Sequence, residues 1–288
     1  MSELAKRVVV ALILAPTVVA AAYVGRAPLA ATLGIIAALG AWELGRMARE
    51  RGVEPLAAGV ALAAAVPLLV QAHYERVFSF PLSAAATLLV ALMGAAIWRR
   101  GVDGRPLTAV AVTVLAVLYT GGTLSFAYGL RYHRFTIPSE PQAGTALLFF
   151  PVVLTWASDI GAYFVGRAIG RHKLIPAVSP GKTVEGALGG VLFTVLVAWA
   201  YVAFVLQPAA HLSVRPLGLV FFGVAISVAA QLGDLAESLF KREAGVKDSS
   251  RLIPGHGGVL DRMDSIFFVL PVAYLLLDRF RLLLPVPQ

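Results

Sequence analysis

Long apolar stretches recur along the chain and decide what it can fold into. Each is about 20 residues long, the length that a helix needs to cross a hydrocarbon core of roughly 30 Å. Only helices and closed barrels satisfy their backbone polar groups in lipid, and these stretches are too long and uniform for barrel strands. We find nine of them, at residues 8–24, 28–48, 55–72, 79–98, 107–130, 145–166, 184–206, 216–240 and 265–284.

The composition agrees with this interpretation. Hydrophobic residues make up 59% of the chain and charged residues only 14%, against roughly 25% charged in a soluble domain. We therefore expect an all-α, polytopic integral membrane protein. Lys6 and Arg7 before the first stretch resemble the start of a signal peptide, but the next apolar helix follows almost at once, so we interpret this stretch as a retained membrane helix. The chain contains no Cys, which excludes disulfides and Cys-ligated metals.

Basic residues are distributed unevenly between the connections. If the N-terminus is cytoplasmic, most of the 24 Lys and Arg residues fall on the cytoplasmic side, as the positive-inside rule requires. This orientation predicts that the connection around residues 241–264 faces the cytoplasm. We expect a multi-pass protein of the cell inner (plasma) membrane. The net charge of +8 is then explained by topology and phosphate binding, so we expect no nucleic acid partner.

The two halves of the sequence differ in their chemistry. We interpret residues 1–130 as membrane helices that form a scaffold and a lipid-facing wall, and residues 131–288 as the helices that carry the catalytic region. Glu43 is the one acid within a membrane helix of the first half, and we interpret it as a surface-level residue paired with Arg46 at i,i+3 spacing. We detect no internal repeat, which weakens an inverted-repeat transporter interpretation.

The most charged part of the chain is residues 238–264, which we call the signature segment. Just before and within it, Asp234, Glu237, Ser238 and Lys241 share one helix face. Asp234 would lie near the hydrocarbon boundary, where an unpaired carboxylate is costly and a bound cation would remove the cost. The alternative is a salt-bridged helix end at the membrane surface.

A glycine-rich turn around His256 occupies the middle of the signature segment. Asp261 and Asp264 follow it, three residues apart at the opening of the last helix. Carboxylate oxygens suit a hard cation such as Mg²⁺, while basic side chains and glycine amides suit phosphates. The alternatives are a solvated loop held by its own ion pairs and, for His256, a role in ordering the turn rather than in proton transfer.

A third group of polar residues lies between residues 156 and 186. Asp159 falls within an apolar run and needs a partner. Ser179, Lys182 and Thr183 stand just before a predicted helix, where they could face a phosphate. The alternative is that Ser179 or Thr183 only caps that helix.

The signature segment resembles that of the phosphatidate cytidylyltransferase (CDP-diacylglycerol synthase) family. The residues that carry the resemblance are Ser238-x-Phe240-Lys241-Arg242, Lys247-Asp248, Ser250, Ile253-Pro254, His256-Gly257-Gly258-Val259 and Asp261-Arg262-Met263-Asp264. Ser158-Asp159-x-Gly161-Ala162-Tyr163 and Ser179-Pro180-x-Lys182-Thr183-x-Glu185-Gly186 resemble a second region of the family. Gly181 and Val184 depart from it, since a basic residue and a Trp are usual there.

The resemblance implies transfer of CMP from CTP to phosphatidate in the bilayer, giving CDP-diacylglycerol and pyrophosphate for phospholipid biosynthesis. It also implies Mg²⁺, as one or two cations, and suggests a homodimer. By this resemblance the metal ligands are Asp234 and Asp261, supported by Asp159. The expected catalytic residues are Lys241, Arg242, Lys247, Asp248, His256, Arg262 and Asp264. The expected substrate-binding residues are Ser179, Lys182, Thr183, Glu185, Ser238, Gly257 and Gly258.

Two alternatives remain open. A related enzyme would use the same chemistry as a cytidylyltransferase or kinase acting on another lipid phosphate or on a polyprenol. A cation-coupled membrane transporter would also place acids within a helical bundle. The acids here gather at one interface and in one half of the sequence, which favours the enzyme.

Overall fold

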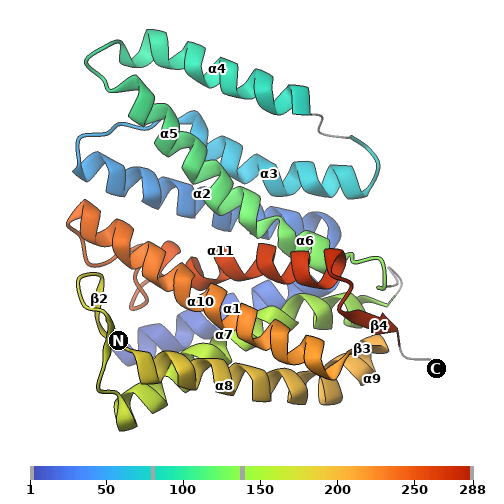
Figure 1. The fold of residues 1–288 in the computed structure, drawn as a ribbon. Helices are drawn as coiled ribbons and strands as arrows, with labels where there is room; N and C mark the ends of the chain where they lie inside the picture. Colours follow the sequence, from blue (N-terminus) through green and yellow to red (C-terminus); the bar gives the residue numbers. More distant parts are fainter. Residues whose placement is uncertain (1–2, 79–81, 137–139, 286–288) are drawn as a thin grey trace. The chain divides into compact units, whose positions relative to one another are not determined.

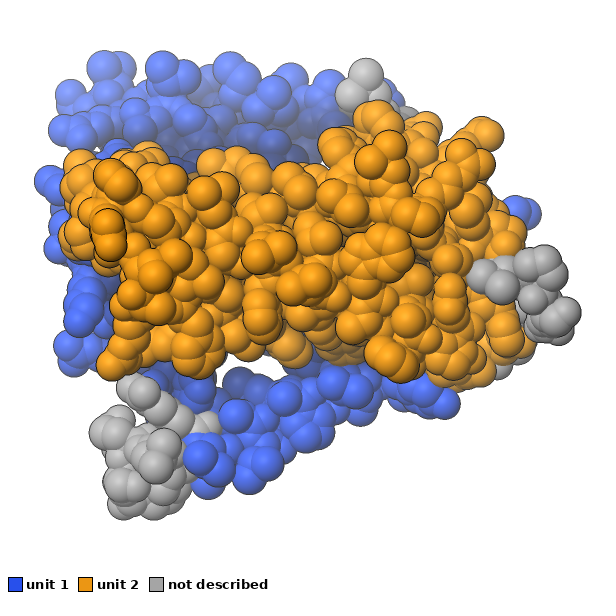
Figure 2. Space-filling view, turned by 60° about the horizontal axis from the view of Figure 1, so that its bottom comes forward, with its two compact units in different colours: residues 1–128, 240–262 blue, residues 129–239, 263–288 orange. Residues whose placement is uncertain are grey.

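The chain is described by a computed structural model over residues 3–78, 82–136 and 140–285 (Figure 1). It divides into two compact units, which Figure 2 distinguishes by colour. Unit 1 comprises residues 1–128 and 240–262, and unit 2 comprises residues 129–239 and 263–288. Most of the signature segment is therefore part of the same unit as the N-terminal helices. The functional division at residue 130 stays a prediction.

Unit 1 is a group of helices packed through small residues. Alanine and glycine let α2 and α3 approach closely: a Cβ added to Gly34 would lie 2.8 Å from the carbonyl oxygen of Ala64. Figure 1 shows α2, α3 and α5 side by side, an arrangement typical of membrane helices, which gain little from the hydrophobic effect and rely on close contact. The elements are α1 Glu3–Val24, α2 Arg26–Glu50, α3 Ala58–Tyr74, α4 Leu82–Arg100, α5 Pro106–Ala116 and a π-helical turn Val117–Gly122, followed by α6 Phe126–Arg131 at the boundary of the units.

Unit 2 is built around α7 and α8, which pack along their lengths. Glycines again allow the approach, since a Cβ on Gly161 would lie 2.5 Å from the Cβ of Phe193. The ring of Phe150 stacks on Tyr201 and Phe222 in the core. The elements are α7 Pro141–Ile169, β1 Lys173–Ile175, β2 Ser179–Thr183, α8 Val184–Tyr201, a π-helical turn Val202–Leu206, α9 Gln207–Ala210, β3 Leu212–Val214, α10 Pro216–Ala244, α11 Leu260–Tyr274, a π-helical turn Leu275–Arg279 and β4 Leu283–Pro285; the end of α10 and the start of α11 belong to unit 1.

Over the described residues, two small antiparallel sheets add to the helices. Strands β1 and β2 pair as a hairpin, with Lys173 opposite Thr183, and β3 pairs with β4. In both sheets the backbone N–H and C=O groups of the two strands satisfy each other by hydrogen bonding. The all-α expectation therefore describes the helical bulk of the chain but missed these strands, because each is only three to five residues long.

Within the part of the chain that the structure describes, five helical segments are long and apolar enough to cross a membrane: Arg26–Glu50, Pro106–Arg131, Pro141–Ile169, Val184–Ala210 and Pro216–Ala244. Large apolar side chains such as Ile97, Phe204 and Leu217 point outward from their helices, as lipid-facing residues do. The predicted last stretch, 265–284, is helical only to Arg279, and residues 283–285 form β4. The start of the predicted stretch 79–98 and the side chains of Lys6 and Arg7 lie outside the described residues.

Candidate active site

The C-terminal end of α10 places Lys241 against Asp261. The helix stops because Gly245 adopts a positive φ of 74°, and the N–H groups of Gly245 and Val246 donate to the carbonyls of Arg242 and Lys241. This is a Schellman motif, which satisfies the last carbonyls of a helix. From the final turn, Lys241 Nζ lies 2.8 Å from Asp261 Oδ1, and the two side chains are only 17% and 7% exposed.

The second oxygen of Asp261 organises the connection between α10 and α11. Oδ2 accepts hydrogen bonds from the backbone N–H of Ser249 (3.0 Å), from Ser249 Oγ (2.9 Å) and from the backbone N–H of Gly258 (2.8 Å). A carboxylate with this many donors is held in one orientation. Both of its oxygens are therefore engaged by the protein.

Glu43 corrects the interpretation made from the sequence. It does not lie at the surface: its exposed fraction is 0%. Its carboxylate accepts hydrogen bonds from Ser249 Oγ and Ser250 Oγ, and from the backbone N–H groups of Val259 (2.9 Å) and Leu260 (2.7 Å). The predicted pairing with Arg46 was wrong, because Arg46 donates instead to the carbonyl oxygen of Ser249, through Nε (3.2 Å) and Nη2 (2.7 Å).

The glycine-rich turn is compact. Ile253 and Gly257 pair across it, and His256 donates its backbone N–H to the carbonyl of Ile253. Arg262 Nε donates to the His256 carbonyl at 2.9 Å, so Arg262 supports the turn. The ring atom Nδ1 of His256 is buried and has no hydrogen-bond partner among the residues described.

Gly258 has no space for a side chain. An added Cβ would lie 1.9 Å from Ser249 Oγ and 2.6 Å from Glu43 Oε1. The N–H of Gly258 already donates to Asp261. This amide therefore stabilises the connection itself and is not directed at a phosphate, contrary to what the sequence had suggested.

A hollow of about 500 Å³ opens beside the same connection. Three basic side chains line it, those of Arg46, Lys247 and Arg251, and Asp248 adds one acid. Arg46 comes from α2, whereas the others come from the signature segment. The surplus of positive charge suits a phosphate-bearing ligand.

Unit 2 holds the other predicted metal ligands. Asp234 Oδ2 lies 2.7 Å from Lys182 Nζ, and Ser238 Oγ donates to Asp234 Oδ1 at 3.3 Å. Asp159 lies within electrostatic range of both Asp234 and Lys182. Lys182 is delivered by strand β2, so the hairpin brings a cation to the two carboxylates.

Asp264 lies close to this group through the backbone of α11. A Cβ on Gly233 would lie 2.6 Å from the Asp264 carbonyl oxygen, so α10 and α11 touch at the residue before Asp234. The Asp264 side chain accepts from the N–H of Ser265 at 2.6 Å.

The remaining residues of the hairpin have structural contacts. Thr183 Oγ1 accepts from the Gly186 N–H at 3.1 Å and caps α8, which is the alternative noted above. Glu185 accepts from the backbone N–H of Arg171 and from the N–H and Nδ1 of His172. Ser179 opens β2 and pairs with Ile175. Glu185 thus holds the start of the hairpin.

Among the described residues, no group of three or more His, Asp or Glu side chains is close enough to form a metal centre. The available oxygen ligands are single carboxylates or the Asp159–Asp234 neighbours. Such a donor set fits Mg²⁺, which is commonly held by one or two carboxylates together with substrate phosphates. It does not fit a structural metal with a full protein cage.

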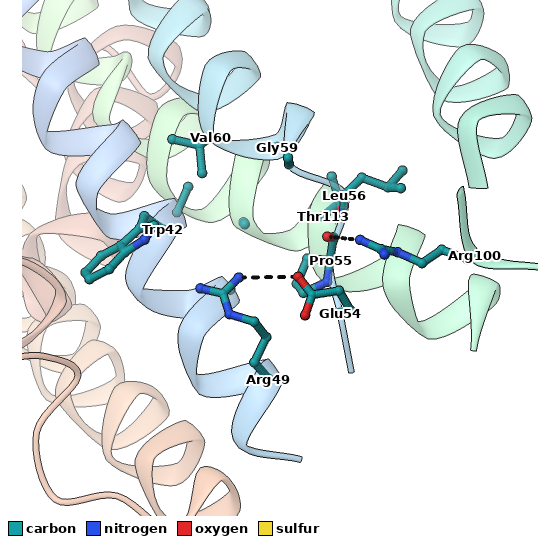
Figure 3. Close-up of a pocket in the computed structure, with 13 residues that line it drawn as sticks. Trp42, Arg49, Glu54, Pro55, Leu56, Gly59, Val60, Arg100 and Thr113 are labelled. Atoms are coloured by element: carbon teal, nitrogen blue, oxygen red, sulfur yellow. Dashed lines mark hydrogen bonds and ion pairs between the residues drawn. The ribbon is translucent and has the colours of Figure 1, made fainter. Parts of the chain in front are cut away.

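A smaller cavity of about 100 Å³ lies elsewhere in unit 1, beside the connection between α2 and α3. Figure 3 shows Arg49 directed at Glu54, 3.7 Å away, and Arg100 donating to the Pro55 carbonyl. It contains none of the residues predicted from the sequence.

Sequence reasoning gave no role in the site to Glu43, Arg46, Ser249 or Ser250, although Ser250 is one of the residues that carry the resemblance. Glu43 did carry a signal, since it is a lone acid in an apolar helix and burial of an unsatisfied carboxylate would be costly. The signal shows that a partner is needed but not which residues provide it.

Comparison with known proteins supplies the family. Phosphatidate cytidylyltransferase of Bacillus subtilis (strain 168) is 43% identical over 160 residues, covering 55% of this chain and 58% of that protein. The proteins of that name from Haemophilus influenzae and Staphylococcus epidermidis are 44% and 42% identical, and the matches cover 55% and 58% of their lengths. The chain thus spans somewhat more than half the length of these relatives. The model of the cytidylyltransferase family matches residues 5–280, which confirms the resemblance, and the chain belongs to this family.

Proposed function

We propose that this chain transfers CMP from CTP to phosphatidate, producing CDP-diacylglycerol and pyrophosphate. The observation that carries the proposal is the signature segment, whose charged residues gather around Asp261 and around a basic hollow of about 500 Å³. Relatives that match this chain bear the corresponding name. The proposed enzyme class is nucleotidyltransferase.

The reaction needs alignment and charge neutralisation more than a strong base. A phosphate oxygen of the lipid, already anionic, forms a bond to the α-phosphorus of CTP. The bond from that phosphorus to the oxygen bridging to the β-phosphate breaks, and pyrophosphate leaves with the electron pair. Two polyanions must approach each other, so cations around the reacting phosphates supply most of the catalysis.

The basic residues divide into two groups by their contacts. Lys247, Arg251 and Arg46 line the hollow and are proposed to bind phosphates directly. Lys241 is paired with Asp261, and Arg262 supports the His256 turn, so we assign these two to holding the site's shape. Arg242, Asp248, Asp264 and His256 remain predicted catalytic residues.

Mg²⁺ is part of the proposal. We propose one cation position at Asp261, within unit 1, and another at Asp234, within unit 2, with Asp159 in support. When bound together with the nucleotide, the ion would neutralise phosphate charge. Lys182 and Lys241 balance the same carboxylates, which indicates that both positions suit a cation.

The topology is also proposed. Nine membrane spans with a cytoplasmic N-terminus would place the signature segment at the cytoplasmic face of the inner membrane, where CTP is available. The acyl chains would remain among the helices while the headgroup reaches the site. A homodimer is proposed on the family resemblance.

The experiment uses protein purified in detergent, with Mg²⁺, phosphatidate and CTP labelled in either the α- or the γ-phosphate. We expect α-label in the lipid fraction and γ-label in pyrophosphate. A lipid carrying γ-label would show a kinase instead, and an unlabelled lipid in both arms would overturn the proposal. Parallel reactions with other lipid phosphates and polyprenols test the lipid preference. A reaction with ATP in place of CTP tests the preference for the nucleobase.

A further inference from the structure

Glu43 in unit 1 is a buried acid to which the proposed reaction gives no direct role. It is a fully buried carboxylate on α2, and four donors from the signature segment converge on it, the nearest in sequence being Ser249, 206 residues later. Burial of a charge is costly unless it is hydrogen-bonded throughout. The four bonds meet that requirement, so Glu43 and the connection between α10 and α11 depend on each other.

Two of the donors fix the beginning of α11. Leu260 is the first residue of α11 and Val259 immediately precedes it, and a helix leaves the N–H groups at this end without internal partners. A carboxylate at this end is also favoured by the helix dipole. Glu43 thus acts as a cap supplied by another helix, and Asp261 is the next residue after the capped pair.

The third link runs through Ser249. Its hydroxyl oxygen lies 3.0 Å from Glu43 Oε2 and 2.9 Å from Asp261 Oδ2. A hydroxyl has one proton to donate, so the two carboxylates share it. The same residue is held from the other side by Arg46, one helical turn after Glu43, which donates twice to the Ser249 carbonyl.

We propose that Glu43 is a positioning residue of the active site, which fixes the orientation of Asp261 through Ser249 and through the first turn of α11. Glu43 acts through Asp261 and does not contact substrate. The catalytic consequence rests on the proposed function, whereas the effect on the connection between α10 and α11 does not. The N-terminal helices then contribute to the reaction as well as to the scaffold.

The test compares Glu43→Gln with Glu50→Gln, which removes an exposed carboxylate from the same helix. Gln replaces one acceptor oxygen by an N–H donor that opposes the donors around it. We expect kcat to fall roughly 10- to 100-fold and the Mg²⁺ concentration for half-maximal activity to rise severalfold, as for other residues that orient a metal ligand. Glu50→Gln should stay within about twofold of the wild type.

A double-mutant cycle separates positioning from a general loss of fold. Ser249→Ala removes the shared hydroxyl but keeps the two backbone bonds of Glu43. If Glu43 acts through Ser249, the double variant loses less kcat than the product of the two single losses, because residues in one network are not additive. Glu43→Asp should recover part of kcat. An unchanged Mg²⁺ dependence together with multiplicative losses would overturn the positioning role.

A second readout is independent of the reaction. Lys247 and Arg251 are exposed trypsin sites within the connection. Glu43→Gln should speed cleavage there, measured by mass spectrometry without substrate, while Glu50→Gln should not. If the wild-type protein makes no CMP-lipid, the proposed function fails and the cleavage rates still decide whether Glu43 holds the connection. Equal rates in the two variants would overturn that structural claim.

Discussion

Asp261 in unit 1 and Asp234 in unit 2 are the same kind of residue in two different environments. Asp261 is 7% exposed and engages a lysine, two backbone N–H groups and a hydroxyl. Asp234 is 35% exposed and engages Lys182 and Ser238. The first is fixed by a closed network that includes backbone groups, while the second engages side chains at a partly exposed position. One position is preorganised, and the other can adjust when a ligand arrives.

The largest effect should come from replacing Asp261. Asp261→Asn loses the charge that pairs with Lys241 and replaces one acceptor oxygen by an N–H donor that faces the donors around it. We expect CMP transfer to fall by roughly 1,000-fold or more, because several kcal/mol of charge stabilisation are lost at about 1.36 kcal/mol per factor of ten. The free energy of unfolding should fall by about 1–3 kcal/mol.

Asp234→Asn is the matched comparison. The transfer activity of this variant should also fall strongly if Asp234 is a metal ligand, but the fold should tolerate the change, since an ion pair open to solvent contributes about 0–1 kcal/mol and this one is partly exposed. Activity and thermal unfolding in detergent measure the two effects. Equal destabilisation by the two variants would remove the contrast between a closed and an open environment.

Gly258→Ala tests the closed network without changing any charge. The new methyl group would lie 1.9 Å from Ser249 Oγ, and overpacking of this kind costs about 1–3 kcal/mol. Gly181→Ala is the control, because its Cβ meets nothing within 4 Å and should change stability by at most about 0.5 kcal/mol. A fully stable and active Gly258→Ala would contradict the described contacts.

Lys182→Met tests the open environment. Without the ammonium group, Asp234 keeps Ser238 and remains accessible to a cation. We expect little change in thermal stability, because both side chains are partly exposed. The KM for CTP should rise by roughly tenfold, the equivalent of one phosphate contact of about 1.4 kcal/mol. A KM equal to that of the wild type would exclude Lys182 from the nucleotide site.

The smallest expected effect is a change of stability with pH, which comes from His133 of unit 2. Its ring lies 3.6 Å from a third carboxylate, that of Asp278. Burial lowers the pKa of His133 below its usual value of 6.5, although Asp278 opposes the shift. The unfolded chain therefore takes up a proton more readily, and stability should fall as the pH drops below 6.5. His133→Gln should flatten this dependence in thermal unfolding from pH 8 to 5. An unchanged slope would exclude His133 as its source.

The positions of the long helices could be predicted from the sequence, because a membrane span is recognised by its length and apolar composition. The helical segments α2, α7, α8 and α10 fall where the apolar stretches predicted them. The small strands were missed, since three-residue pairings carry no periodic signal. The identity of the signature segment was also readable, because its residues are contiguous and their spacing is specific.

The sequence was insufficient for the site's internal contacts. Spacing along one helix suggested Arg46 as the partner of Glu43, because nearby residues are the ones that a local pattern can compare. The actual partners follow more than 200 residues later, from Ser249 to Leu260. Long-range partners of a single buried charge have no local pattern, so only the three-dimensional structure identifies them.

The bond between Glu43 and the start of α11 limits how this protein can be recombined. A chimera that joins residues 131–288 to the first helices of another membrane protein would place four hydrogen-bond donors opposite a foreign side chain. It would keep every residue of the recognisable motif and still lose the orientation of Asp261. A working chimera requires that the foreign helix also carries a carboxylate and a guanidinium one turn apart. The segment that must be transferred together is therefore larger than the motif.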